Sequence, residues 1–297
     1  MPMSPEQSNQ TSQSQASPIV PTVDAHQHYW QLARFAYGWN RQINLPEMLR
    51  DYMPPDILPQ MQACGIQYSV VIQADNSVAE TRWLLELARD YPHIAGVVGW
   101  VDLAAADAGE TLDHLAGYPL FKGIRLMPLP QDEAGWQSLG GGLRALAARN
   151  FTCDLLPDEA TLPAAIEAMR THPETRFVIN HFAGLPLTPG GIASWTAQMR
   201  PLAALPNVFL KCSAIQGLAD PPPITAATLR PYLDSVLALF GAERLLFGSD
   251  WPVSTLSGPY AECIQVMREV TAALSDDEQA WLWGKTAAMT YRLRLQR

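Results

Sequence analysis

The 297-residue sequence lacks the features that mark several large classes of protein. It has no uninterrupted apolar run of about 18 residues, which excludes a transmembrane helix that hydropathy would detect. The opening stretch "MPMSPEQSNQTSQSQASPIV" has no apolar h-region, so we expect no secretory signal, no membrane partner and a cytoplasmic protein. Its polar Gln/Ser/Pro composition predicts a disordered tail over residues 1–19, followed by a single domain over residues 20–297.

Basic residues are also scarce. Lys and Arg number 20 against 29 Asp and Glu, the net charge is −9, and no basic run occurs, which argues against a nucleic-acid partner. The four cysteines are far apart and form no C-x-x-C pair, so they predict small buried residues in a reducing compartment and no disulfide framework.

What the sequence does contain is an alternation of short apolar runs with amphipathic segments. Near-continuous apolar runs are typical of strands that are buried on both faces. The runs are "TVDAHQH" (22–28), "YSVVIQ" (68–73), "IAGVVGWV" (94–101), "FKGIRL" (121–126), "FTCDLL" (151–156), "RFVINH" (176–181), "NVFLKCS" (207–213) and "RLLFGSD" (244–250). The segments between them predict helices; at the start of one, Ser77 and Glu80 have the spacing of a capping box.

Eight such alternations predict an α/β fold, namely a (β/α)₈ TIM barrel. The alternative is an open doubly wound sheet. Against that alternative, no G-x-G-x-x-G motif follows the first apolar run.

Polar residues stand at the ends of the predicted strands. Active residues of a TIM barrel lie at the C-terminal ends of its strands, and an inert barrel would need no polarity there. The strand-end residues are His26, His28, Gln73, Trp100, Asp102, Arg125, Asp154, His181, Lys211, Ser213 and Asp250.

Alternation along a strand separates these candidates. His26 and His28 are two residues apart, so they face the same side and can share one ligand. An isolated histidine pair at this spacing more often has a structural role or lies on the surface than binds a metal. With His181 and Asp250 at the ends of other strands, metal binding becomes the favoured interpretation. For Arg125, a substrate contact and a salt bridge in the barrel wall weigh about equally.

Three further polar residues are not assigned to the predicted site. Lys211 is expected to snorkel beside Cys212, and Asp24 to have a structural role. Asp154 stands too early in its run to be assigned to the site.

Five motifs together carry a family resemblance: "DAHQHYW", "GVVGWVDL", "KGIRL", "FVINH" and "LLFGSDWPV". From about Val20 to the C-terminus the sequence resembles the amidohydrolase-related (amidohydrolase 2) metal-dependent hydrolases of the TIM-barrel superfamily. It is most similar to their sugar-lactonase branch, which includes fuconolactonase and rhamnonolactonase, and more distantly to pyrone dicarboxylate lactonase. The resemblance matches His26 and His28 to the strand-one H-x-H pair, His181 to the strand-six histidine and Asp250 to the strand-eight aspartate.

This resemblance implies a hydrolase that opens a lactone of a sugar acid or a related small cyclic ester. Asp250 would activate water, and His28 and His181 would act with it on the substrate carbonyl. His26, His28, His181 and Asp250 would hold one divalent metal, zinc or manganese, with metal-free polarisation by the histidines as the alternative. A bridging carboxylated lysine is not expected, because Lys122 stands near the start of strand four. The predicted substrate-binding residues are Arg125, Gln73, Trp100 and Trp30.

Departures from the family pattern lie around the substrate. Leu126 stands where a histidine is expected, Asn180 replaces an acid, and Ala214 replaces a glycine. Two other functions stay open: metal-dependent non-oxidative decarboxylation on the same scaffold, and non-catalytic binding of a sugar acid. The partner is expected to be a small molecule. A homo-oligomer is compatible with the sequence, which does not define the oligomeric state.

Overall fold

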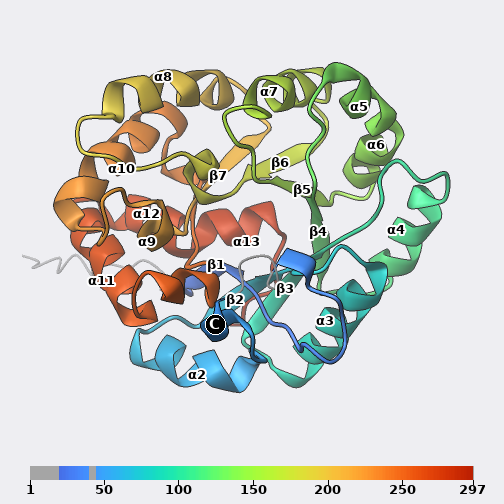
Figure 1. Cartoon of the computed structure of the whole chain (residues 1–297), viewed down its shortest axis with the longest axis horizontal. Helices are drawn as coiled ribbons and strands as arrows, with labels where there is room; N and C mark the ends of the chain where they lie inside the picture. Colours follow the sequence, from blue (N-terminus) through green and yellow to red (C-terminus); the bar gives the residue numbers. More distant parts are fainter. Residues whose placement is uncertain (1–19, 40–44, 297) are drawn as a thin grey trace, which may run out of the picture.

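A barrel of parallel strands forms the centre of the molecule. The computed structural model describes residues 20–39 and 45–296, so the predicted tail over 1–19 lies outside the described residues. Within the described part, eight strands form one sheet in chain order, with every neighbouring pair parallel (Figure 1). The strands are β1 (Val23–Gln27), β2 (Tyr68–Ile72), β3 (Ile94–Gly99), β4 (Phe121–Leu126), β5 (Thr152–Leu155), β6 (Arg176–Ile179), β7 (Val208–Cys212) and β8 (Leu245–Phe247). The predicted (β/α)₈ TIM barrel is confirmed.

Helices surround the barrel. They are α2 (Pro54–Ala63), α3 (Val78–Asp90), α4 (Ala108–Ala116), α5 (Glu133–Ser138), α6 (Gly140–Ala148), α7 (Leu162–Thr171), α8 (Ile192–Ala203), α9 (Ile215–Leu218), α10 (Ala226–Phe240), α11 (Tyr260–Thr271), α12 (Asp276–Ala280) and α13 (Thr286–Thr290). Short 3₁₀ turns and one π-helical turn, Trp281–Lys285, complete the chain. Among the described residues, no helix combines the length and the apolarity needed to cross a bilayer.

The predicted capping box at α3 is half formed. The Ser77 hydroxyl accepts from the backbone N–H of Glu80, as expected of an N-cap. The carboxylate of Glu80 does not return to Ser77; it accepts from the backbone N–H groups of Ala74 and Asp75 at 2.9–3.1 Å. Glu80 therefore fixes the loop that follows β2, at the same end of the barrel as the strand-end residues.

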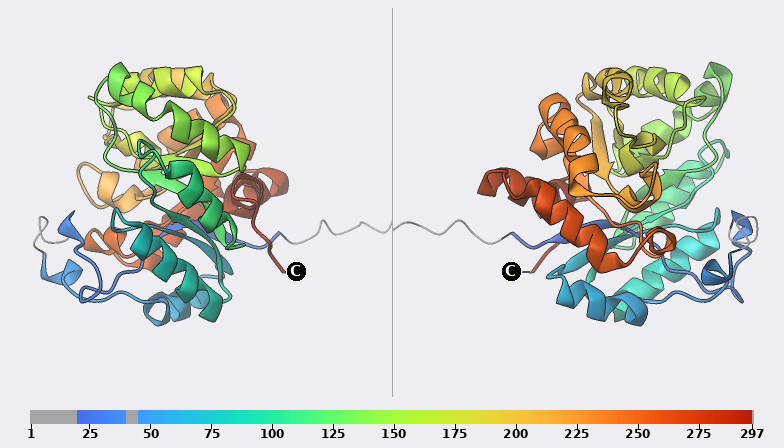
Figure 2. Two further views of the ribbon diagram at one scale, coloured as in Figure 1. Left: turned by 90° about the vertical axis from the view of Figure 1, so that its right-hand side faces the viewer. Right: turned by 60° about the vertical axis from the view of Figure 1, so that its left-hand side comes forward.

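Two apolar layers explain why the strands are apolar on both faces. The outer layer packs the strands against the helices. The inner layer fills the lower half of the barrel and comprises Val23, Ala25, Val70, Ile72, Val98, Val178, Phe209 and Leu246, joined by Ala287 and Tyr291 near the C-terminus. In Figure 2 the loop between β1 and α2 lies at one end of the barrel and α13 at the other. The other end of the barrel interior, formed by the C-terminal ends of the strands and called the upper end below, is lined by polar residues.

The closure of the barrel between β1 and β8 depends on the buried carboxylate of Asp24. Its Oδ1 accepts from the backbone N–H of Ser249 at 2.8 Å, and its Oδ2 accepts from Gln27 Nε2 at 2.8 Å and Tyr260 OH at 3.2 Å. The backbone continues the junction: the N–H of Asp250 donates to His26 O at 2.9 Å, and that of His28 donates to Trp251 O at 2.8 Å. Asp24 has the structural role expected from the sequence.

We expect Asp24→Ala to lower the free energy of unfolding by about 3 kcal/mol, because it leaves buried donors on β1, on the segment after β8 and on α11 without an acceptor. Urea unfolding followed by circular dichroism measures this. Asp113→Ala is the matched control: Asp113 forms an exposed ion pair with Arg149, and we expect a loss below about 1 kcal/mol. Equal losses in the two variants would contradict the role of Asp24.

Candidate functional site

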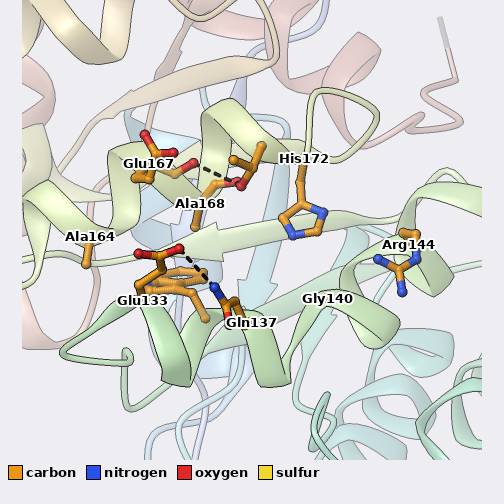
Figure 3. A pocket seen from close by; sticks show the side chains of 10 residues that line it. Glu133, Gln137, Gly140, Arg144, Ala164, Glu167, Ala168 and His172 are labelled. Carbon is orange, nitrogen blue, oxygen red and sulfur yellow. Dashed lines mark hydrogen bonds between the residues drawn. The ribbon is translucent and has the colours of Figure 1, made fainter.

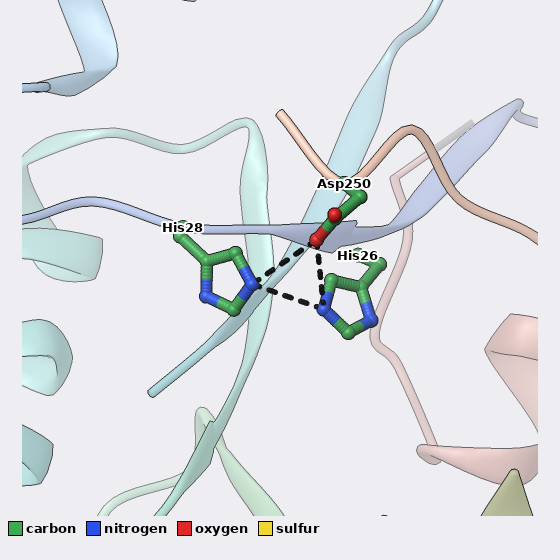
Figure 4. Close-up of side chains that lie close together, drawn as sticks. All are labelled: His26, His28 and Asp250. Carbon is green, nitrogen blue, oxygen red and sulfur yellow. Dashed lines mark hydrogen bonds and ion pairs between the residues drawn. The ribbon is translucent and has the colours of Figure 1, made fainter. Parts of the chain in front are cut away.

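His26, His28 and Asp250 converge at the upper end of the barrel (Figure 4). The distances from Asp250 Oδ1 are 3.4 Å to His26 Nε2 and 3.3 Å to His28 Nε2, and the two imidazole Nε2 atoms are 3.1 Å apart. The two histidines face the same side, as alternation along β1 predicted. All three side chains are buried, so a ligand that reached them would be shielded from bulk water.

His181 is the fourth member of this cluster, from the turn after β6. Its Nε2 lies 3.6 Å from Asp250 Oδ1, and its ring packs against that of His26 with 4.3 Å between centroids. Ser213, at the end of β7, holds His181 through two contacts of its hydroxyl: it accepts from the backbone N–H at 3.1 Å and lies 2.8 Å from Nδ1. Three Nε2 atoms therefore surround one carboxylate oxygen.

The backbone is strained at two of these four residues. Asp250 has φ 66° and His181 has φ 56°, in the left-handed region that non-glycine residues avoid. Such strain costs about 1–3 kcal/mol per residue and gathers at functional sites. Ala214, where the resembling family has glycine, also has a left-handed φ of 54°. The surrounding packing thus holds Asp250 and His181 in backbone conformations that an unrestrained chain would not keep.

Burial and neighbouring charges fix the ionisation of the cluster. Burial, aided by Arg125 and Lys211, lowers the pKa of His181 to about 3 even though Asp250 opposes the shift. Burial and the Lys211 charge likewise hold the pKa of His26 well below its usual value. Burial alone would raise the pKa of Asp250, but His181, His28 and Arg125 outweigh it and keep this pKa low. Asp250 is therefore a carboxylate at neutral pH, beside two neutral imidazoles.

Arg125, from β4, is a buried cation near this cluster. Its side chain is only 8% exposed, and among the described residues its guanidinium has no hydrogen-bond acceptor; Nε is fully buried without a partner. Burial lowers its pKa, while the charges of Asp250 and Asp154 act in the opposite direction. A guanidinium whose donors are unused is available to a carboxylate or hydroxyl oxygen of a ligand.

The other predicted substrate-binding residues lie in different surroundings. Gln73 donates to Asn76 Oδ1 at 2.7 Å, and Trp100 donates to Met127 O at 3.3 Å, so both belong to the loops that rim the barrel. Trp30 is fully buried between Trp39 and Tyr52, and its indole N–H donates to Arg50 O at 2.7 Å. Trp30 thus offers no free surface or donor to a ligand; it packs the loop after β1.

Lys211 and Asp154 form a buried pair beneath the histidines, and neither was assigned to the site from the sequence. Lys211 Nζ lies 2.7 Å from Asp154 Oδ2 and 3.3 Å from His26 Nδ1, with both charged side chains fully buried. The expectation that Lys211 snorkels to water is wrong, because the Asp154 carboxylate compensates its charge inside the barrel. Alternation along the strand could have predicted the inward position of Lys211, because Phe209, Lys211 and Ser213 fall on the same face of β7.

A separate cavity of about 300 Å³ lies between α5, α6 and α7 (Figure 3). Its lining includes Arg144, Glu167 and His172 and contains none of the strand-end residues. The three-histidine cluster, with its strained backbone and buried carboxylate, is the better candidate for chemistry, because catalytic groups in this fold lie at the strand ends.

The cluster has the donor set for one metal ion. The ligand atoms of His26, His28 and Asp250 lie within 4.8 Å of one another. Imidazole nitrogen and carboxylate oxygen are ligands that suit zinc, and His28 Nδ1 lies 2.9 Å from Ile72 O, the kind of outer contact that orients a histidine ligand. On donor type and spacing, these three residues fit a single ion.

A family model described as amidohydrolase matches residues 23–293. The chain belongs to the amidohydrolase family. This amidohydrolase is 37% identical to an L-fucono-1,5-lactonase of Burkholderia ambifaria over 91% of its own length and 95% of the relative's. It is 36% identical to an L-fucono-1,5-lactonase of Burkholderia multivorans, with 91% and 96% covered. A crystal structure of an amidohydrolase from Burkholderia multivorans with bound zinc superimposes with a TM-score of 0.83 at 34% identity, covering 92% of this chain and 100% of that one. The family expected from the five motifs is confirmed.

We expect Arg125→Met to stabilise this amidohydrolase by about 1 kcal/mol, because it removes a buried cation that no hydrogen bond compensates. Arg244→Met is the matched control. The Arg244 guanidinium donates to the carbonyl oxygens of Leu205 and Ala203 at 2.9 Å, so its loss should destabilise the protein by about 2 kcal/mol. Urea unfolding measures both variants. If Arg125→Met is destabilised as much as Arg244→Met, the guanidinium has a structural role that its contacts do not reveal.

Proposed function

We propose that this amidohydrolase hydrolyses the lactone of a sugar acid, with Asp250 as the general base. The observation that carries the proposal is the Asp250 carboxylate surrounded by the Nε2 atoms of His26, His28 and His181 at 3.3–3.6 Å. The curated relatives that are named L-fucono-1,5-lactonases support this substrate class, since each aligns over more than nine-tenths of this chain.

The first step uses the low pKa of Asp250. The ionised carboxylate takes a proton from water while the water oxygen forms a bond to the lactone carbonyl carbon. The electrons of the carbonyl π bond move to its oxygen, which becomes an oxyanion. An imidazole N–H near this oxygen stabilises the charge, since a preorganised donor in a buried site is worth more than one in water.

The second step opens the ring. The oxyanion re-forms the carbonyl, the bond from this carbon to the ring oxygen breaks, and protonated Asp250 returns its proton to the leaving alkoxide. The product is the open hydroxy acid, and Asp250 is ionised again. Arg125 would hold a hydroxyl oxygen of the substrate, because its guanidinium is buried and none of the described residues accepts a hydrogen bond from it.

A divalent ion is compatible with the same residues. His28, Asp250 and His26 would hold it, with zinc or manganese as the ion, and when bound it would supply Lewis-acid polarisation of the lactone carbonyl. His181 would remain beside Asp250 through the contacts of Ser213.

We expect the purified protein to open L-fucono-1,5-lactone or another aldonolactone, and Asp250→Asn to lower kcat about a thousandfold, since the amide cannot take the proton from water. A pH-indicator assay over a panel of aldonolactones, with zinc, with manganese and after chelation, measures the acid released. Asp113→Asn on the exposed face of α4 is the control and should keep wild-type activity.

Two results would count against the proposal. If no lactone is opened under any metal condition, the hydrolase assignment fails, and metal-dependent decarboxylation and non-catalytic binding of a sugar acid remain. If Asp250→Asn opens the lactone at the wild-type rate, the ring is opened by a different base.

A further inference from the structure

The first turn of α3 contains a buried acid that the capping of the helix does not account for. Ser77 caps the helix by accepting from the backbone N–H of Glu80. The Glu80 side chain is fully buried, and its carboxyl oxygens accept from the backbone N–H of Ala74 at 3.1 Å and from that of Asp75 at 2.9 Å. Burial of an acid costs free energy, so we looked for what these two contacts hold in place.

The loop after β2, which Glu80 holds, is the attachment point of the loop after β1. The carbonyl oxygen of Ala74 accepts from the indole N–H of Trp39 at 2.6 Å. The side chain of Asp75 accepts from the backbone N–H of Tyr37 at 3.3 Å. Trp39 and Tyr37 both belong to the loop after β1. The two residues whose N–H groups donate to Glu80 are therefore the same two residues that bind this loop.

The loop after β2 is also joined to the loops after β3 and β4. Asn76 Nδ2 donates to Met127 O at 3.0 Å, and Trp100 Nε1 donates to the same oxygen at 3.3 Å. Asn76 Oδ1 accepts from Gln73 Nε2 at 2.7 Å. The loops after the first four strands thus form one hydrogen-bonded wall at the C-terminal ends of the strands, where a barrel of this kind binds its ligands. This loop wall comprises residues 37–39, 73–76, 100 and 127.

We propose that Glu80 is a positioning residue for substrate binding, which holds the loop wall in the arrangement that presents Gln73 and Trp100 to the substrate. Glu80 acts through the backbone of Ala74 and Asp75 and not by contact with the substrate. The effect on substrate binding rests on the proposed function. The coupling of Glu80 to the loop after β1 does not, because it requires no substrate.

This role does not depend on the charge of Glu80. Burial raises the pKa of Glu80 to about 8, although the hydrogen bonds from Asp75 and Ala74 oppose the rise. A carboxyl group has an oxygen that accepts a hydrogen bond in its neutral form as well as in its ionised form. The position therefore requires acceptor oxygens at the right distance, and Glu80→Gln, which keeps one of the two oxygens, should retain part of the function.

Hydrogen exchange followed by mass spectrometry tests the coupling on the full-length protein. In Glu80→Ala we expect peptides that cover residues 31–39 to exchange about tenfold faster or more, because the attachment points of Tyr37 and Trp39 lose their support. Glu80→Gln should give a smaller increase. Ser77→Ala is the matched control: it removes the cap of the same helical turn but no contact to the loop after β2, so residues 31–39 should exchange at the wild-type rate.

Kinetics with a lactone that the protein opens give the second readout. Glu80→Ala should raise KM about tenfold and leave kcat within about twofold, because the loop wall is loosened while Asp250 and the histidines keep their places. A general loss of stability would reduce the amount of active enzyme without changing KM. If Glu80→Ala does not fold, Glu80→Gln and Trp39→Phe, which removes the indole donor to Ala74, give the same two measurements.

Three outcomes overturn the proposal: wild-type exchange of residues 31–39 in the Glu80 variants, equal acceleration in Glu80→Ala and Ser77→Ala, or an unchanged KM in a Glu80 variant that opens the lactone. The exchange measurement is independent of activity. If no lactone is opened but residues 31–39 exchange faster in the Glu80 variants alone, the proposed function fails while the coupling of Glu80 to the loop after β1 stands.

Discussion

The junction between β1 and β8, tied by the buried carboxylate of Asp24, is the constraint on which the site depends. A barrel has no edge only if its first and last strands meet. Here Asp24 reaches from β1 to the backbone of Ser249, and the backbones of His26 and Asp250 are then joined directly. The same contacts that close the barrel place the histidines of the first strand beside the aspartate that follows the last. Residues that are more than 200 positions apart in the sequence thereby form one cluster.

Most of the fold was predictable from the sequence, because strands buried on both faces leave a pattern that can be counted. The four residues of the cluster were also predictable, since a polar residue at the end of an apolar run is conspicuous. Their contacts were not. Lys211 and Asp154 lie on strands that are not neighbours in the sheet, and their pairing depends on the interior of the closed barrel. Trp30 shows the opposite error: an aromatic residue next to the H-x-H pair looks like a pocket wall, but the folded loop buries it completely.

The interior of the barrel treats its buried charges in two ways. The charges of Lys211 and Asp154 compensate each other at 2.7 Å, and the hydroxyl groups of Tyr291 and Thr152 also donate to the carboxylate. Arg125 is paired in register with Asp154 on the neighbouring strand, yet within the described residues it has no hydrogen-bond acceptor. The first arrangement is what a stable interior requires. The second leaves a buried guanidinium whose hydrogen bonds no described residue accepts, and this difference between the two cations is what supports the ligand-binding role proposed for Arg125.

The two histidines of the first strand also lie in different surroundings. Identical side chains at positions i and i+2 share one face, yet the atom behind each ring differs: the carbonyl oxygen of Ile72 lies 2.9 Å from His28 Nδ1, and Lys211 Nζ lies 3.3 Å from His26 Nδ1. Different residues therefore orient the two rings: the backbone of the neighbouring strand β2 contacts His28, and the buried Lys211–Asp154 pair lies beneath His26. The geometry of an H-x-H pair thus depends on the residues beneath it as well as on those that face the cluster.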